Sequence, residues 1–250
     1  MVAYTRKKKR GRRRKFSRKQ RGGGNGAKDR NIAFYSCFFG DSASVANQVP
    51  PLPSEKYDCY FFTNNKDTSN KAKSAGWIPV LNNAIQNGSD RENALNSKKV
   101  KACPHLFNEL KGYKYTCYFD SKLRVYENDI ENFLNEFKEG VVMLLNKHSF
   151  IKGSVNDEFE EAMKQPRYAV DREKYKGFID SNLKAGLKDT VDVHYETGLI
   201  IRLSGDKVNS IGEKWYEYIK ETGPECQISF FFTQQEFKET IRPLSKHYGY

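Results

Sequence analysis

The stretch IAFYSCFF, residues 32–39, decides the fold class, and Gly40 and Asp41 follow it directly. A short run of apolar and aromatic residues that ends in turn-forming residues is typical of a buried strand. Five later runs have the same character: YDCYFFT at 57–63, WIPVL at 77–81, YTCYF at 115–119, VVMLL at 141–145 and LIIRL at 199–203. Most of these runs are apolar throughout rather than alternating, which predicts a mostly parallel sheet with both faces covered.

Helical patterns lie between and after these strands. They cover residues 90–101, with Ser89 or Asp90 as the cap, and 128–138, 155–164, 171–185, 206–221 and 227–238. Strands that alternate with helices predict an α/β, Rossmann-like sheet flanked by helices. Such sheets bind ligands beyond the carboxyl ends of their strands. The polar residues that directly follow strands are therefore the first candidates for a site.

The charge of the chain is concentrated at one end. The 250 residues have a formal net charge of +12, but residues 1–30 contain 14 Lys and Arg and one acid, while the other 220 contain 29 basic and 30 acidic side chains. A segment with so much charge and so few apolar residues is expected to be disordered. We therefore predict a disordered basic tail with a Gly-rich linker over 1–30 and a single neutral domain over 31–250.

Composition argues against several classes of protein. No run of apolar residues is long enough for a transmembrane helix, and the start is too charged for a secretory signal, so we expect a cytoplasmic protein that is not secreted. Its five cysteines are widely spaced and form no CxxC pair. Reduced, buried thiols fit this arrangement better than a disulfide framework or a zinc site.

Several segments of the chain have a familiar order. NIAFYSCFFGD, YDCYFFTNN and GWIPV come first, then KKVKACPHLFNELKGYKYTCYFDSKLRV, and then YETGLIIR, Trp215 and CQISFFF. Together they resemble the opening, the most distinctive block and the later blocks of a glycosyltransferase-like family catalogued as domain of unknown function 616, which includes plant proteins described as mucilage-related hexosyltransferases. The likeness spans roughly residues 31–235. It implies a GT-A-type fold and transfer of a hexose or related sugar from a nucleotide-sugar donor to an acceptor.

The resemblance gives Asp120 the leading role on the donor side. A carboxylate at the end of a buried strand can reach a divalent cation, Mn²⁺ or Mg²⁺, that neutralises the departing diphosphate. GT-A enzymes commonly carry an Asp-x-Asp pair there, whereas this chain has Asp120-Ser121-Lys122. Either Asp120 holds the metal with diphosphate and water, or Lys122 pairs with phosphate directly.

Other donor contacts are expected from two segments. Lys98 and Lys101 lie three residues apart and share a face of the predicted helix, from which they can contact phosphate. The alternative is an ordinary solvated helix face, and Lys101 is the better match to the family block. Gly40 and Asp41 can approach the nucleotide base or ribose, although any strand must end in a turn.

Three residues are expected on the acceptor side. Glu196 opens the YETGLIIR segment and can act as base toward a hydroxyl or orient it, or it can instead pair with a cation such as Arg202. Gln227 stands where the family has Asp-Gln-x-Ser-Phe, although Cys226 replaces the acid and Glu225 precedes it. His148 follows the 141–145 strand and can contact the acceptor or phosphate, or have no role.

The basic tail supports a different class of function. Fourteen cations in thirty residues are expected to bind nucleic acid or an anionic membrane surface, or to serve as a nuclear address. The alternative to an enzyme is therefore a non-catalytic, degenerate transferase fold that binds or packages a polyanion through its tail. The altered residues Lys122 and Cys226 keep this alternative open.

Overall fold

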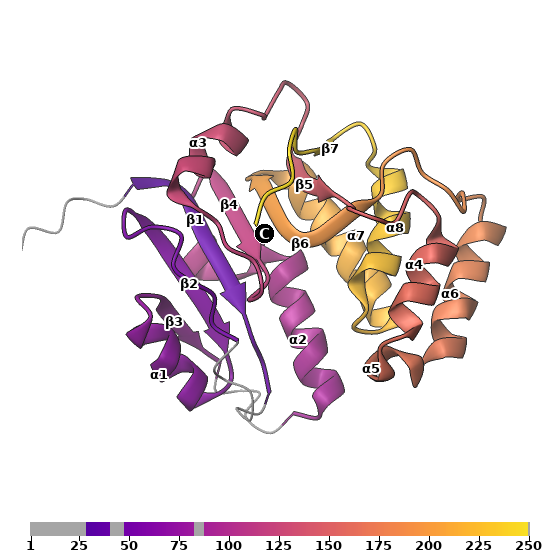
Figure 1. The fold of residues 1–250 in the computed structure, drawn as a ribbon, viewed down its shortest axis with the longest axis horizontal. Coiled ribbons are helices and arrows are strands. Elements are labelled where there is room, and N and C mark those ends of the chain that lie inside the picture. Colours follow the sequence, from indigo (N-terminus) through magenta and orange to yellow (C-terminus); the bar gives the residue numbers. More distant parts are fainter. Residues whose placement is uncertain (1–28, 41–47, 83–87, 250) are drawn as a thin grey trace, which may run out of the picture.

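A computed structural model of the chain describes residues 29–40, 48–82 and 88–249. Its centre is a seven-stranded sheet of order β3-β2-β1-β4-β6-β5-β7 (Figure 1). The strands are β1 (Asp29–Cys37), β2 (Tyr57–Thr63), β3 (Ile78–Leu81), β4 (Tyr115–Phe119), β5 (Met143–Lys147), β6 (Tyr195–Leu203) and β7 (Ile241–Pro243). Only β6 runs antiparallel to its neighbours, β4 and β5. The predicted mostly parallel α/β sheet is confirmed.

Helices cover both faces of this sheet. They are α1 (Lys66–Ser74), α2 (Asp90–Ala102), α3 (Glu127–Leu134), α4 (Val155–Met163), α5 (Pro166–Ala169), α6 (Arg172–Lys184), α7 (Asp206–Thr222) and α8 (Cys226–Glu236). Within the described ranges, no helix is long and apolar enough to cross a bilayer. Figure 1 shows α4, α5 and α6 grouped beside α8, at the opposite end of the molecule from α1.

Successive residues of the strands feed two different hydrophobic clusters, because side chains of a strand point to alternate faces. Ala33 and Tyr35 of β1 join a cluster built with α2, α7 and α8. Ile32 and Phe34 join the opposite cluster, built with α1 and α3. All five residues of β4 are buried, as the apolar run predicted.

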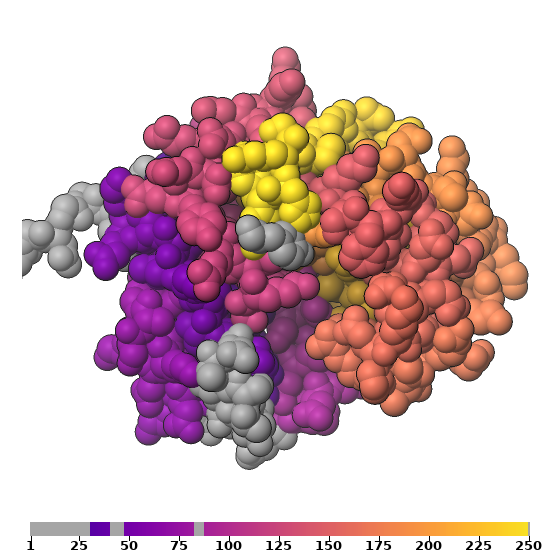
Figure 2. Space-filling view, in the orientation of Figure 1, coloured from indigo at the N-terminus to yellow at the C-terminus, as the bar shows by residue number. Residues whose placement is uncertain are grey.

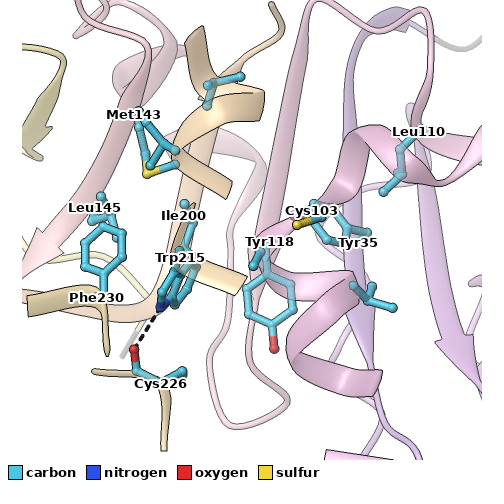
Figure 3. Packing of buried hydrophobic residues seen from close by; sticks show 14 of the residues in the cluster. Tyr35, Cys103, Leu110, Tyr118, Met143, Leu145, Ile200, Trp215, Cys226 and Phe230 are labelled. Carbon is cyan, nitrogen blue, oxygen red and sulfur yellow. Dashed lines mark hydrogen bonds between the residues drawn. The ribbon is translucent and has the colours of Figure 1, made fainter. Parts of the chain in front are cut away.

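Trp215 of α7 is the largest fully buried side chain and holds two helices together. Its indole nitrogen donates a hydrogen bond of 3.0 Å to the carbonyl oxygen of Cys226, at the start of α8 (Figure 3). It also lies at 3.1 Å from Ser229 Oγ. The start of α8 is thereby fixed beside the sheet.

Buried Arg202 of β6 fixes the end of α2. Its guanidinium donates to Tyr35 Oη at 2.8 Å and to the carbonyl oxygen of Lys101 at 2.7 Å. These two hydrogen bonds join Arg202 to β1 and α2. They do not go to Glu196, which the sequence analysis had offered as a partner of Arg202. The arrangement places the last turn of α2 against the end of β4.

Several boundaries differ from those predicted. Strand β1 ends at Cys37, β5 is shifted to Met143–Lys147, and β6 begins at Tyr195 because the polar residues before Leu199 are also in the sheet. Helix α3 ends at Leu134, four residues before the predicted end. Helix α1 was missed because its sequence, KDTSNKAKS, buries only Thr68 and Ala72. Strand β7 was missed because it has three residues, one of them a proline.

The five cysteines all lie among the described residues and form no disulfide. Four of them are buried and Cys37 is half-buried. The prediction of buried thiols is confirmed for these four cysteines. No cysteine pair contributes to the stability of the fold.

Candidate functional site

Asp120 lies at the carboxyl end of β4, where β6 crosses in the opposite direction. Its backbone N–H donates to the carbonyl oxygen of Gly198 at 2.8 Å. A Cβ atom at Gly198 would lie in ordinary contact with Asp120 Oδ2, at 3.5 Å, and in a tight contact with Leu123 Cδ1, at 3.1 Å. The side chain of Asp120 is 33% exposed.

Two neighbours hold the Asp120 carboxylate. Tyr118 donates its hydroxyl to Oδ1 at 2.6 Å, and Lys101 Nζ lies 3.5 Å from the same oxygen. The Lys101 side chain is only 3% exposed, and its ammonium group lies 5.0 Å from the centre of the Tyr118 ring. Lys101, which was predicted to contact phosphate, thus contacts the carboxylate at the end of β4 directly.

The lysines set the charge of Asp120. Burial alone raises the pKa of the carboxyl, but Lys101, Lys98, the Tyr118 hydroxyl and Lys122 outweigh burial and hold the pKa below its ordinary value. Asp120 is thus ionised at neutral pH. Lys122 itself is exposed.

Lys98 lies one turn before Lys101 and is half-buried. Burial lowers the pKa of its ammonium group, but Cys226, Tyr168, Asp120 and Glu225 more than offset burial, so the pKa lies above its ordinary value. Lys98 therefore stays charged, between the end of β4 and the start of α8.

Glu196 is buried near the start of β6, two residues before Gly198. Its Oε1 accepts hydrogen bonds from the backbone N–H of Ser149 at 3.2 Å and from the Ser149 hydroxyl at 2.9 Å. His247 Nε2 lies 3.0 Å from Oε2. Burial raises the pKa of Glu196, but the hydrogen bonds from Ser149 and the charges of His247 and His148 lower it by more. The pKa of Glu196 is therefore below its ordinary value.

His148 and Gln227 meet at a residue that the sequence analysis missed, Glu158 of α4. Gln227 Nε2 donates to both carboxylate oxygens at 3.0 and 3.1 Å, His194 Nε2 lies at 2.8 Å from Oε2, and His148 Nε2 lies at 3.9 Å. Gln227 Oε1 accepts from the backbone N–H of Thr197 at 3.0 Å. The network joins α4, α8 and β6 beside Glu196.

The tautomer of His148 follows from its other nitrogen. Nδ1 accepts the backbone N–H of Ile151 at 3.1 Å, so in the neutral ring the proton is on Nε2, which faces Glu158. Burial lowers the pKa of His148 in spite of the nearby Glu158 carboxylate. A neutral imidazole here orders the turn after β5.

Gly40 lies at the end of β1 with φ of +117°, and its N–H donates to Asn64 Oδ1 at 2.9 Å. The Asn64 side chain in turn donates to Asn93 Oδ1 of α2 at 2.8 Å. Asn64 follows β2 and was itself one of the polar positions that the strand ends pointed to. Asp41 lies outside the described residues.

The C-terminal segment contributes His247, which no sequence signal pointed to. Tyr248 exchanges two hydrogen bonds with the buried Asn146 side chain, of 3.1 and 2.8 Å, and Gly249 accepts from the N–H of Arg124 at 3.0 Å. Figure 2 shows this segment in yellow on the surface of the molecule. These contacts hold His247 beside Glu196.

The structure thus brings Asp120, Lys101 and Lys98 together, and it places Glu196 on the strand that Asp120 contacts. Gln227 and His148 join this strand through Glu158 rather than reaching Asp120 directly. Two missed residues, Tyr118 and Ser149, had a weak signal, since Tyr118 precedes Asp120 by two residues and Ser149 follows His148. Glu158 had none, because one acid on a predicted amphipathic helix is indistinguishable from a solvated one.

The residues around Asp120 do not fit a divalent cation. Mg²⁺ and Mn²⁺ require several oxygen ligands, whereas Asp120 faces ammonium groups and its Oδ1 already accepts a hydrogen bond. Across the part of the chain that the structure describes, no group of three or more His, Cys, Asp or Glu side chains is placed to hold a metal ion. These residues therefore argue against the Mn²⁺ or Mg²⁺ that the sequence led us to expect at Asp120.

Comparisons with known proteins support the fold. No protein-family model matches the chain, and no curated protein matches it. Among solved structures, the apo crystal structure of mouse xyloside xylosyltransferase 1 is similar, with a TM-score of 0.50 and 11% sequence identity over 85% of this chain and 84% of that chain. At this identity the likeness shows a glycosyltransferase-like fold, and it assigns no substrate.

Proposed function

We propose that the chain is a glycosyltransferase that moves a hexose or related sugar from a nucleotide-sugar donor to an acceptor hydroxyl. The observation that carries the proposal is the contact of Asp120 with Lys101 at the carboxyl end of β4, directly beside β6 and in a glycosyltransferase-like fold. Ligands of open α/β sheets bind at such strand ends. The likeness of the sequence segments to the domain of unknown function 616 family points to the same class of reaction.

The donor side consists of the cations and the strand ends. Lys98, Lys101 and Lys122 bind the diphosphate, and Asp120 keeps the buried Lys101 in place. Gly40, whose N–H is held by Asn64 beyond the carboxyl ends of β1 and β2, contacts the nucleotide base or ribose in this proposal. In the reaction, the bond between the anomeric carbon and the diphosphate oxygen breaks, and the diphosphate leaves with the bonding electrons.

The acceptor side is built around Glu196. Its carboxylate is ionised at neutral pH and can take the proton of the acceptor hydroxyl as that oxygen bonds to the anomeric carbon, or orient the hydroxyl. Gln227 and His148 act as positioning residues, because they hold Glu158, and Gln227 holds the backbone next to Glu196. His247 lies where it can receive the proton from Glu196.

Donor binding by thermal shift tests the proposal. The full chain is mixed with UDP-, GDP- and CMP-sugars, and a UDP- or GDP-sugar, which carries a diphosphate, is expected to raise the unfolding midpoint. A ligand at 100 times its dissociation constant adds about 2.7 kcal/mol of stability. Asp120→Asn is expected to abolish the shift, whereas Asp180→Asn, at an exposed position of α6, is expected to keep it. A folded protein that no donor stabilises contradicts the proposal.

A second function is favoured by one observation, the confinement of the net charge to residues 1–30. We propose that these residues bind a polyanion, nucleic acid or an anionic membrane surface. The test compares the full chain with a full chain in which the twelve Lys and Arg of residues 6–21 are replaced by Gln. Loss of binding to DNA or to anionic vesicles in the Gln form assigns the partner, and equal binding by both forms excludes the tail as its cause. The cytoplasmic location expected from the sequence stays a prediction.

A further inference from the structure

The end of β4 carries more positive than negative charge. Lys98, Lys101 and Lys122 surround the single carboxylate of Asp120, and each of the three lowers the pKa of that carboxyl. The next carboxyl toward α8, Glu225, also faces Lys98, but its pKa is raised by burial and by the Glu158 carboxylate. A group with a raised pKa carries less negative charge at a given pH than an ordinary Glu. Three lysines thus face one ionised carboxylate, Asp120, and a second acid whose negative charge is reduced.

Burial makes this excess charge significant. The Lys101 side chain is 3% exposed, and a buried ammonium group without a full partner is costly unless a ligand or a second acid completes it. Its distance of 3.5 Å from Asp120 Oδ1 is longer than a close ion pair, and that oxygen already accepts from Tyr118 at 2.6 Å. Lys101 thus retains hydrogen-bonding capacity toward a further anion.

The same arrangement disfavours a divalent cation. A dication at Asp120 would lie beside the ammonium group of Lys101 and within the field of Lys98, and like charges in a partly buried site repel strongly. Lys122, two residues along the chain, adds a third positive charge on the exposed side. What this site lacks is negative charge, and a diphosphate supplies it.

We propose that Lys98 and Lys101, with Lys122 at the exposed rim, take the place of a divalent cation, so that this site binds the diphosphate of its donor without a metal. The inference rests on the proposed transferase function and names how that function handles the charge of the leaving group. Lys98 and Lys101 are three residues apart on one face of α2, and both act on the Asp120 carboxylate, so their charges are directed to the same strand end. Their charge stabilises the diphosphate as it leaves, which is the role of cationic clamps in phosphoryl and glycosyl transfer.

Titration calorimetry on the full chain tests this inference, with UDP, GDP and CDP as probes, each in EDTA and each in Mn²⁺. We expect one nucleoside diphosphate to bind in EDTA with a dissociation constant within about twofold of that in Mn²⁺. Lys98→Gln is expected to weaken binding at least tenfold, or about 1.4 kcal/mol. Lys99→Gln, one residue along the same helix and exposed, is the matched control and is expected to bind like the unaltered chain.

Each result separates the inference from the function it rests on. Binding that is lost in EDTA and restored by Mn²⁺ overturns the inference and leaves the transferase proposal standing. Equal weakening by Lys98→Gln and Lys99→Gln overturns it as well, since it would reflect the general charge of α2. Failure of all three nucleotides in both conditions overturns both. Because Lys101→Gln can unfold the chain, the decision is made on Lys98 and on the EDTA comparison.

Discussion

The two halves of the sheet bury polar groups in different ways. In the β3-β2-β1-β4 half, the strands are largely apolar, and charged groups gather at the strand end, where Asp120 meets Lys101. In the β6-β5-β7 half, a network of Glu158, His148, His194 and Gln227 is buried between helices and strands. The first half presents cations and the second presents carboxylates and imidazoles. Under the proposed function, the first half is the donor half and the second the acceptor half, because a diphosphate needs positive charge and a hydroxyl needs a base.

The substitution expected to have the largest effect on one half alone is Glu196→Gln. Without the carboxylate, the acceptor proton has no base, and turnover with the stabilising donor is expected to fall by about 10²- to 10⁴-fold. Donor binding is expected to stay unchanged, because Glu196 belongs to the other half. Ser149→Ala, which removes one hydrogen bond to Glu196, is the control and is expected to lower turnover far less. If calorimetry shows that Glu196→Gln loses donor binding as well, the division into two halves is wrong.

The halves meet where α2 packs on α7, and Gly212 permits that contact. A Cβ atom at Gly212 would lie 2.2 Å from the carbonyl oxygen of Ala102, which is backbone and cannot rotate away. Gly212→Ala is therefore expected to lower the free energy of unfolding by about 1–3 kcal/mol or more, measured by urea denaturation. Gly177→Ala on α6, where a Cβ meets nothing within 4 Å, is expected to stabilise by about 0.5–1 kcal/mol. If the two substitutions change the free energy of unfolding equally, α2 and α7 can move apart without loss of stability, and the close packing at Gly212 is not needed.

The carboxyls of the two halves respond to pH in opposite directions. The pKa of Asp120 lies below 3.8 in the folded state, so its stabilising contribution is present above that pH and is lost as pH falls through the folded value. The pKa of Glu225 lies above its ordinary 4.5 because of burial and Glu158. The folded state then holds a proton that the unfolded state has released, and stability falls as pH rises from about 4.5 through the folded value.

Urea unfolding at pH 5 and pH 8 measures this contrast. Glu225→Gln is expected to flatten the loss of stability between these values, by about 1–3 kcal/mol, since a neutral amide leaves no buried charge to form. The amide oxygen can still accept one of the two N–H bonds at the start of α8 that Glu225 accepts from Gln227 and Ile228. Asp120→Asn leaves the slope in this window unchanged. A Glu225→Gln protein whose stability falls with pH as steeply as before contradicts this explanation.

Local patterns decide what could be predicted from the sequence. The apolar runs predicted β1, β2, β4, β5 and the core of β6, because a strand buried on both faces must be apolar along its length. Helical patterns predicted α2 in one half of the sheet and α4, α6, α7 and α8 in the other. Asp120, Lys98 and Lys101 were each predicted to contact the donor diphosphate, and the structure brings these three residues together. The fold-level prediction was thus confirmed in both halves, for the elements that local patterns indicate.

Long-range polar contacts could not be predicted in this way. Glu158 and His247 are each 36 or more residues from a partner, His194 or Glu196, and nothing local distinguishes them from surface residues. The start of β6 was missed for the same reason, since the polar residues of YETG are buried only because Ser149 and Gln227 satisfy them. Burial of a polar side chain depends on a partner that folding brings, and a single sequence does not identify that partner.

The smallest predicted effect would sharpen the donor half of the comparison. Lys122→Asp removes an exposed cation and adds an acid two residues from Asp120, which changes the local charge by two units without touching the buried contacts of Lys101. In EDTA, nucleoside diphosphate binding is expected to weaken about tenfold, or 1.4 kcal/mol. Mn²⁺ is expected to restore part of it in this variant and to leave the unaltered chain unchanged, because only the variant has two carboxylates for an oxygen-seeking cation. Lys111→Asp, at an exposed lysine in the turn before β4, is the control for net charge. An equal response to Mn²⁺ in the unaltered chain would mean that Asp120 alone recruits the metal and that the lysines only accompany it.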